Sequence, residues 1–456
     1  MRDRHGIGGD PAAALDLAAK VADLAAAAGA TEAEALVFDG DSALTRFANS
    51  EIHQNVASSE VFVNLRFVRG RRVGVASSGR ADREGLRALV ERAGAIASNV
   101  EEDEDWAGLP DADVPEPLPA AWSAGTANAT PELRAEGARA VIAACDDARV
   151  TAYGAFSTDT EAVAVANTKG VRAAERRTTS QLLTVTMGPD GGTGYAERCN
   201  VDATAINAAA IGREAAERAR SSAHPVAIEA GDYPVVLHHY AVVDLLDMLG
   251  YLGFSARAAQ EDRSFFEAGK RVGSPLVTIA DDGRDPAGLP TAFDAEGVPK
   301  QRLLLLDQGV CRDLAYDQET AAKEGRRSTG HGLPAPNPYG PFPTNMVMSA
   351  GETPYDDLVS GMDRGLLVTR FHYTNAVHNK RVVITGMTRD GTYLVESGRV
   401  IAPVRNLRFT MSYLDALANV EAVSRERLCI RGMMGGSVVP ALRLSSFSFT
   451  GVTAEV

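Results

Sequence analysis

Histidine and aspartate side chains are concentrated in one short stretch of the chain, residues 235–257, which reads VVLHHYAVVDLLDMLGYLGFSAR. Imidazole and carboxylate groups are zinc ligands, and a zinc site needs several of them to converge. His238 and His239 fall between an expected strand and an expected helix over 240–250, and their side chains point apart if the strand continues through them. Asp244 and Asp247 share a helix face, but neither lies three or four residues from a histidine. We therefore interpret the stretch as a strand-end histidine pair followed by a solvated acidic helix face.

The common motifs of self-sufficient catalysts are missing from the sequence. None of the eight histidines is followed by glutamate, which excludes every motif of the H-E-x-x-H type. The patterns G-x-S-x-G, G-x-x-x-x-G-K-[ST] and G-x-G-x-x-G do not occur either. We therefore assign no catalytic residue from motifs of these kinds.

A glycine-flanked histidine offers a further candidate, in the cluster Ser328, Thr329, Gly330, His331 and Gly332. Such a histidine beside two hydroxyls could act as a general base, or the cluster could bind an anion through its backbone N–H groups. Short polar clusters rich in glycine are also ordinary loop chemistry, so both interpretations stay open. The cluster belongs to the irregular stretch 323–345, and loops of this length in a compact domain tend to be functional.

The remaining histidine and cysteine candidates favour structural roles. His372 and His378 would share a strand face by their even spacing, but a turn is expected between them. Cys311 and Cys429 have no histidine nearby in the sequence, and we expect both to be packing residues.

The elements that must position these residues follow from periodicity and capping signals. Residues 61–68 and 72–76 predict a hairpin that turns at Arg69-Gly70-Arg71, with 42–47 and 51–56 as further strands. We expect helices near 11–28, 82–98, 131–147 and 202–220, and strands within 149–187. The order helix, β-meander, helix thus occurs twice, which indicates a weak internal duplication.

The sequence divides into an α+β half and a mainly β half. Residues 1–100 predict an N-terminal α+β domain, 101–122 an acidic, proline-rich linker, and 123–230 a central α+β region. From 231 to 456 short strands dominate, which suggests a sandwich or a barrel-like domain. The predicted fold class is α+β, with antiparallel sheets and helices in an N-terminal α/β region and a mainly β C-terminal domain.

Composition and charge limit the classes of function. The chain has 456 residues, 45% of them hydrophobic, and a net charge of -14. Its basic runs, 69–72 and 326–327, are too short to displace counterions from a duplex, so we expect no nucleic-acid partner. No stretch is apolar enough for a membrane span, and the beginning of the chain lacks a signal-peptide pattern. Four scattered cysteines without C-x-x-C spacing fit a reducing compartment, so we expect a cytoplasmic protein.

Several stretches together resemble the TldD/PmbA family, whose PmbA branch is also called TldE. FANSEIHQN followed by VNLRFVRGRRVGVASS is similar to the family's first domain. Residues 291–332 and 384–417 resemble its C-terminal domain, so the resemblance runs in order along nearly the whole chain. In this family a TldD subunit supplies zinc through a His-Glu-x-x-x-His helix and a distant cysteine, and works paired with a TldE subunit.

By this resemblance the zinc motif would fall at residues 247–252, and the chain lacks its ligands there. Asp247 and Leu252 stand at the two histidine positions and Met248 at the glutamate position, so these residues supply no adequate zinc set. Cys429 lies near the family's cysteine position, with Glu426 an equally good match. The resemblance therefore implies a chain with no catalytic residues and no metal or other cofactor of its own.

The expected role is that of a non-catalytic TldE/PmbA-type subunit in a heterodimeric zinc metallopeptidase that cleaves small or unfolded peptides. Zinc is expected in the TldD-type partner, whose active-site chamber this chain would complete. Ser328, Thr329, His331 and Cys429 are the candidates for contacting that chamber. Two alternatives stay open: a homodimeric metallopeptidase with an atypical metal site, and a protein-binding regulator of the gyrase-modulator kind.

Overall fold

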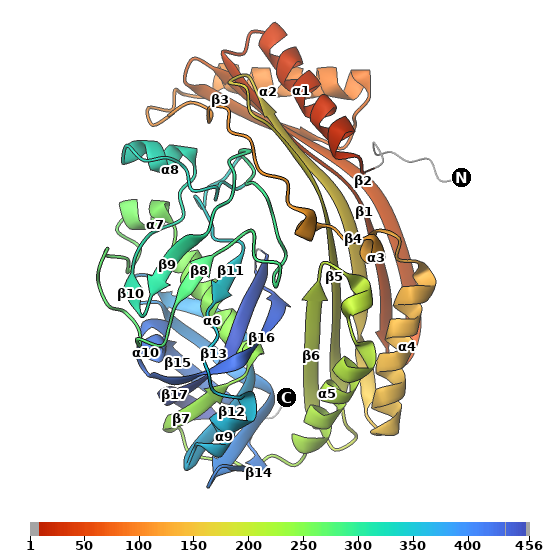
Figure 1. Ribbon diagram of the computed structural model, residues 1–456, viewed down its shortest axis with the longest axis vertical. Helices are drawn as coiled ribbons and strands as arrows, with labels where there is room; N and C mark the ends of the chain where they lie inside the picture. Colours follow the sequence, from red (N-terminus) through yellow and green to blue (C-terminus); the bar gives the residue numbers. More distant parts are fainter. Residues whose placement is uncertain (1–8, 434, 453–456) are drawn as a thin grey trace.

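The computed structural model describes residues 9–433 and 435–452, which form two β-sheets with helices around them (Figure 1). The predicted α+β class is confirmed, with an antiparallel sheet and helices in the N-terminal half and a mainly β C-terminal half. None of the helices in these two ranges is long and apolar enough to cross a membrane.

The N-terminal sheet has six strands in the order β3-β2-β1-β4-β5-β6, and every neighbouring pair is antiparallel. The strands are β1 (Glu32–Ala48), β2 (Glu51–Arg69), β3 (Arg72–Ser78), β4 (Thr151–Asn167), β5 (Arg172–Met187) and β6 (Thr193–Asn200). The predicted turn at Gly70 is present, and its φ of 66° is one that glycine adopts at little cost. The strands predicted at 42–47 and 51–56 are not separate. The first is the end of the longer strand β1, and the second is the beginning of β2, which also contains the predicted strand 61–68.

One seam joins the two halves of this sheet. β1 pairs with β4 from Glu34 opposite Asn167 to Phe47 opposite Gly154, so residues before 100 and after 123 share one layer. The strands bend together along their length (Figure 1), as expected from the right-handed twist of long antiparallel sheets.

Four helices cover one face of the N-terminal sheet, and they begin at side-chain caps. They are α1 (Pro11–Ala27), α2 (Arg83–Asn99), α4 (Pro131–Asp147) and α5 (Ala208–Ser221), with N-caps Asp10, Asp82, Thr130 and Asn207. Each cap accepts a hydrogen bond from a backbone N–H of the first turn, which supplies a partner that the helix lacks. Two apolar clusters form beneath these helices.

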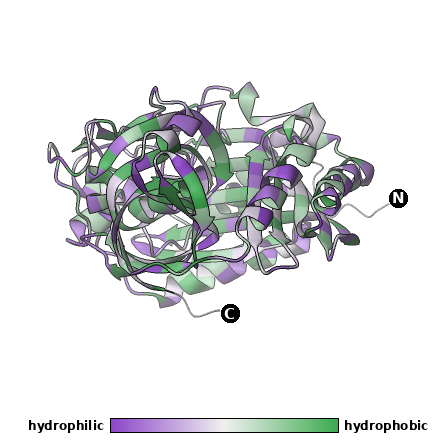
Figure 2. Ribbon diagram, turned by 90° about the horizontal axis from the view of Figure 1, so that it is seen from below, coloured by the Kyte–Doolittle hydropathy of each residue, from purple (hydrophilic) through white to green (hydrophobic). Residues whose placement is uncertain are grey.

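The C-terminal sheet curls into a barrel-like ring. Its strands are β7 (Gly231–Leu237), β8 (Ile279–Asp281), β9 (Leu303–Asp307), β10 (Val310–Cys311), β11 (Met346–Met348), β12 (Arg364–His378), β13 (Val383–Glu396), β14 (Arg399–Pro403), β15 (Leu407–Ser412), β16 (Val420–Arg431) and β17 (Gly436–Val452). The ring closes because β17 pairs with both β15 and β7, while β13 and β12 complete the path between them. Seen from below, these strands curve around a region rich in hydrophobic residues (Figure 2).

The remaining helices are short, except for the one that follows β7. They are α3 (Ala124–Ala127), α6 (His239–Leu252), α7 (Ala256–Gln260), α8 (Gln318–Lys323), α9 (Tyr355–Ser360) and α10 (Tyr413–Ala418), with 3-10 turns η1 (Pro119–Ala121) and η2 (Ala203–Ala205). Most residues of α6 are buried in the main C-terminal core.

The predicted linker, 101–122, is packed against both halves. Leu109 is fully buried, and its N–H donates to Glu32 of β1 at 2.9 Å. Asp105 pairs with Lys323 at 2.9 Å, so the segment also contacts the C-terminal half. The segment is therefore an ordered connection that packs against both halves of the molecule.

Candidate functional site

A cavity of about 720 Å³ lies between the two sheets. The uncovered face of the N-terminal sheet forms one wall, with Phe38, Phe62, Asp159, Glu161 and Arg177. The loops of the C-terminal half form the other, with residues from 289–300, 331–345 and 431–436. Its size suits a ligand of several residues.

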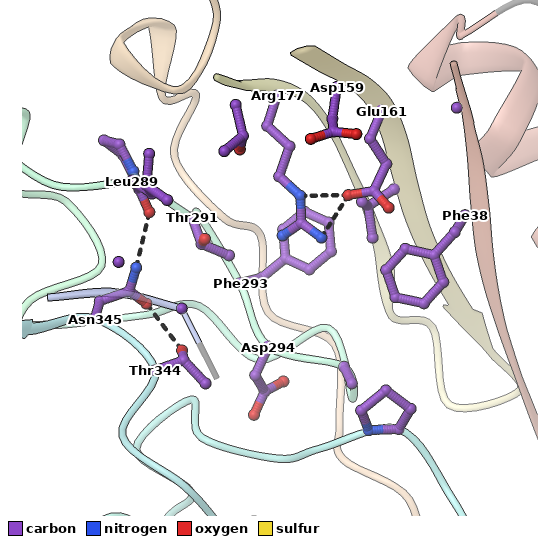
Figure 3. A pocket seen from close by; sticks show the side chains of 18 of the residues that line it. Phe38, Asp159, Glu161, Arg177, Leu289, Thr291, Phe293, Asp294, Thr344 and Asn345 are labelled. Atoms are coloured by element: carbon purple, nitrogen blue, oxygen red, sulfur yellow. Dashed lines mark hydrogen bonds and ion pairs between the residues drawn. The ribbon is translucent and has the colours of Figure 1, made fainter. Parts of the chain in front are cut away.

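The sheet wall combines aromatic rings with an ion pair. Phe38 and Phe62 face each other across β1 and β2 with ring centroids 6.3 Å apart. On the neighbouring strands, Arg177 binds the Glu161 carboxylate at 2.7 Å (Figure 3). Burial raises the pKa of Asp159 beside them, although Ser42 donates a hydrogen bond to its carboxylate. This wall offers apolar surface and fixed charges to an extended ligand.

The opposite wall carries His331, whose ring is held from two sides. The Thr329 hydroxyl lies 2.9 Å from His331 Nδ1. Asp281 Oδ1 lies 3.0 Å from Nε2. Lys300 Nζ binds the same Asp281 oxygen at 3.1 Å, and all of these side chains are buried. The histidine is therefore a fixed part of the wall.

Burial and neighbouring charges set the protonation states of Asp281 and His331. Burial opposes ionisation of Asp281, but Lys300 and His331 together hold the pKa of that carboxyl well below its usual range. Burial, aided by the charge of Lys300, lowers the pKa of His331. At neutral pH the imidazole is consequently neutral beside a salt bridge between Lys300 and Asp281.

Two further carboxyl groups belong to the loop that forms this wall: Asp294 lines the cavity (Figure 3), and Glu296 follows two residues later. Asp294 accepts hydrogen bonds from the backbone N–H groups of Gly332, Glu296 and Val298 at 2.7–2.9 Å. Glu296 pairs with Arg66 of β2 at 3.3 Å, and this contact ties the loop to the N-terminal sheet. Burial raises the pKa of both carboxyl groups, and the proximity of Asp294 raises that of Glu296 further, because ionisation of one opposes ionisation of the other.

The four residues predicted to contact a chamber lie in different places. His331 lines the cavity. Ser328 and Thr329 line a separate hollow on the other side of the loop, and both bind the Tyr316 carbonyl oxygen. Cys429 lies on β16, and its Sγ atom is 3.1 Å from Cys199 Sγ on β6.

The adjacent histidines His238 and His239 stand at the start of α6. His238 is the N-cap and His239 the first helical residue, so the strand does not continue through them. Their rings lie 4.7 Å apart, and the condition under which they would point apart, a strand that continues through both, is not met. His238 Nε2 contacts the Arg218 guanidinium at 2.9 Å, while His239 Nε2 lies 3.1 Å from the Glu426 carbonyl oxygen. Burial lowers the pKa of both, to about 4 for His239.

The aspartates of α6 are not a solvated face, contrary to the sequence interpretation. Asp244 accepts hydrogen bonds from Thr374 and Tyr413, both at 2.7 Å. Asp247 accepts one from the Met433 N–H at 2.8 Å, beside the cavity. Gly432 makes this approach possible, because an added Cβ there would meet Asp247 Oδ1 at 2.5 Å. Both carboxylates thus bind neighbouring segments, a role that local periodicity does not reveal.

The donors around α6 do not fit a zinc ion. Met248 and Leu252, at two of the three motif positions, are buried in the apolar core and offer no nitrogen or anionic oxygen. The Asp247 carboxylate already accepts a hydrogen bond from the backbone N–H of Met433. Within residues 9–433 and 435–452, no three His, Cys, Asp or Glu side chains are grouped so that they could hold a metal ion. His238, His239, His331 and Cys429 accordingly do not converge.

Sequence reasoning missed the sheet wall of the cavity. Glu161 and Arg177 lie on different strands and meet only because β4 and β5 pair in a register that sets these two residues opposite each other. The available signal was the run of four polar residues at 158–161, TDTE, which puts polar side chains on both faces of a strand where one face would otherwise be apolar.

Comparison with known proteins extends over most of the chain. Residues 33–97, 126–223 and 230–451 match, in order, domain 1, the central domain and the C-terminal domain of the PmbA/TldA metallopeptidases. A metalloprotease TldD homolog of Haemophilus influenzae is 29% identical over 265 residues, which are 54% of each chain. One from Buchnera aphidicola (subsp. Acyrthosiphon pisum) is 28% identical over 48% of this chain and 44% of its own. The chain spans about half the length of the curated relatives that it matches.

Solved structures share the fold over almost the full length. TldE from Thermococcus kodakarensis superposes with a TM-score of 0.88 at 19% identity, over 95% of this chain and 99% of its own. A Thermotoga maritima protein described as a candidate modulator of a DNA gyrase gives 0.84 at 20% identity, over 95% and 99%. At such identities the likeness concerns the fold.

Proposed function

The chain belongs to the PmbA/TldD metallopeptidase family, and we propose that it acts there as the non-catalytic, TldE-type subunit of a two-chain zinc metallopeptidase. The observation that carries the proposal is the state of helix α6. Where the family resemblance puts two histidines and a glutamate, this helix has Asp247 bound to a backbone N–H, and Met248 and Leu252 packed in the core. Zinc and the residue that activates water then come from a TldD-type partner in the cytoplasm.

The cavity supports a role in enclosing a peptide. Its walls combine the Phe38 and Phe62 rings with the Glu161–Arg177 pair, a mixture suited to an extended chain of no fixed sequence. This chain would then close one side of a chamber that small or unfolded peptides enter.

A strand edge beside the cavity supports the same role. β3 pairs with β2 only from Val63 onward, and within the described parts of the chain residues 51–62 have β1 as their single strand partner. Ser58, Glu60 and Phe62 on this edge line the cavity. A peptide added there would gain main-chain hydrogen bonds and place alternate side chains in the cavity.

The test is zinc content and peptide cleavage, measured on the chain purified alone and after co-expression with a TldD-type partner. We expect no stoichiometric zinc and no cleavage from the lone chain, and both from the pair. About one zinc per chain together with cleavage by the lone protein would overturn the proposal and favour a homodimeric enzyme with an atypical metal site.

A regulator of the gyrase-modulator kind is the second candidate, favoured by the description of the Thermotoga maritima structure. Affinity capture with the tagged chain separates the two. Recovery of gyrase without any TldD-type protein would favour the regulator, and recovery of a TldD-type chain supports the peptidase subunit.

A further inference from the structure

Two cysteines from opposite halves of the molecule meet between the sheets. Cys199 lies on β6 of the N-terminal sheet and Cys429 on β16 of the C-terminal sheet, 230 residues away in sequence. Their Sγ atoms are 3.1 Å apart, and both are free thiols. Cys145 and Cys311 are also free but buried elsewhere, in the helix-covered core and on β10.

The backbones on both sides of this pair are fixed. Cys199 pairs with Gln181 in the β5–β6 ladder, and Cys429 with Val438 in the β16–β17 ladder. The Arg431 N–H donates to Glu197 Oε1 at 3.0 Å and so joins the same two strands two residues farther on. The two thiols are therefore held in contact by strands that are paired on both sides.

We propose that Cys199 and Cys429 form a redox modification site, at which a peroxide oxidant closes a disulfide between the two halves of the chain. The Cys429 thiolate attacks one peroxide oxygen, and the other oxygen leaves as water, which gives a sulfenic acid. The Cys199 sulfur then attacks the Cys429 sulfur, the S–S bond forms, and a second water leaves. Two thiols are thus oxidised by two electrons, and one peroxide is reduced to two waters.

The order of the two steps follows from access. Cys429 is half-buried and can meet an oxidant, whereas Cys199 is only 3% exposed. The hydrogen-bonding contact with Cys429, together with burial, raises the pKa of the Cys199 thiol, so this sulfur is the less reactive of the two toward the oxidant. Cys199 thus suits the resolving role.

Formation of the Cys199–Cys429 disulfide would restrain one wall of the cavity. β16 runs on from Cys429 into residues 431–433, which line the cavity wall. A disulfide between β6 and β16 would fix that wall to the N-terminal sheet, and closing so long a loop restricts the unfolded chain strongly. This inference does not depend on the proposed function, because it concerns the lone chain.

The experiment treats the full-length chain with graded hydrogen peroxide, blocks the remaining thiols under denaturing conditions, and maps the products by mass spectrometry. Trypsin should release residues 199–213 joined to residues 428–431, with Cys145 and Cys311 alkylated. The melting temperature should rise by several degrees on oxidation and fall back when a dithiol reductant is added.

Cys199→Ser and Cys311→Ser are the matched variants. The first should lose both the cross-linked peptide and the shift in melting temperature, and the second should keep both. Conversion of Cys429 to a sulfinic acid in the unaltered chain, with Cys199 still alkylated, would overturn the proposal.

Discussion

Asp247 and Asp281 are two enclosed carboxyl groups near the cavity whose surroundings move their pKa values in opposite directions. Lys300 and His331 contact Asp281 and hold its pKa low in spite of burial. At Asp247, whose carboxylate accepts the Met433 N–H, burial dominates and raises the pKa to about 7. The same side chain therefore serves as a permanent anion at one position and as a titrating group at the other.

Replacement of Asp247 by asparagine tests this difference. Because its folded-state pKa is raised above the unfolded value near 4, the native carboxyl contributes stability that is complete below pH 4 and is lost as pH rises through about 7. Wild type should lose on the order of a few kcal/mol of unfolding free energy across this window, and Asp247→Asn should flatten that part of the profile. Melting temperature measured between pH 4.5 and 8.5, a range of about four units, provides the readout.

Asp23→Asn serves as the control, since Asp23 is exposed on α1. The melting temperature of this control variant should depend on pH in the same way as that of the wild type. An Asp247→Asn profile as steep as that of wild type would show that Asp247 is already ionised throughout the window.

At this scale the sequence identified one residue of the cavity wall and missed others for a physical reason. His331 was found because histidine beside hydroxyls is chemically conspicuous, and it does line the cavity. Lys300, Asp281 and the Glu161–Arg177 pair were not found, because each depends on a partner more than ten residues away.

At the scale of elements, α6 is the clearest case of a helix whose residues serve packing. Eleven of its fourteen residues are buried, and Leu252 is 3% exposed in the main C-terminal core. Tyr251, its neighbour, is 41% exposed and lies against Tyr339 with ring centroids 6.4 Å apart. Adjacent residues of one helix thus differ sharply in how much apolar packing they contribute to the core.

Leu252→Ala and Tyr251→Ala form a matched pair on this helix. We expect Leu252→Ala to cost about 2–5 kcal/mol of unfolding free energy, because it removes buried methyl groups and leaves a cavity. Tyr251→Ala should cost about 0.5 kcal/mol or less, as most surface substitutions do. Equal losses in chemical denaturation of the two variants would mean that the end of α6 is not part of the core.

Local signals predicted the elements better than their pairing. Helix α4 spans the predicted residues 131–147, and α2 begins and ends within one residue of the predicted range 82–98. The β1–β4 seam and the closure of β17 on β7 were not predicted, because strand partners are chosen by the core and leave no mark on either strand alone.

At the scale of the whole molecule, a charged network joins the two halves below the cavity. Glu214 of α5 binds Arg198 at 2.8 Å and Arg218 at 2.6 Å, and it accepts a hydrogen bond from Tyr240 of α6 at 2.9 Å. Arg218 in turn contacts His238. Each half has its own core, and this network is one of the links through which unfolding of one half destabilises the other.

Glu214→Gln should weaken that coupling. The variant leaves two guanidinium groups without their anion, and we expect a loss of about 1–3 kcal/mol and a broader or divided transition in calorimetry. Glu217→Gln, on the exposed side of the same helix, should melt like wild type. A single sharp transition at the wild-type temperature in Glu214→Gln would show that the halves are coupled elsewhere.

The β1–β4 seam has a consequence for how the chain is made. Phe38 of β1 pairs with Val163 of β4, so the ribosome must add more than a hundred residues before the central strand of the sheet gains its second neighbour. Throughout that interval the hairpin of β1, β2 and β3 exposes an unpaired edge on β1, which other nascent chains could join. A holding chaperone that covers this edge, or an uninterrupted passage of the ribosome past residue 167, would therefore limit aggregation during synthesis.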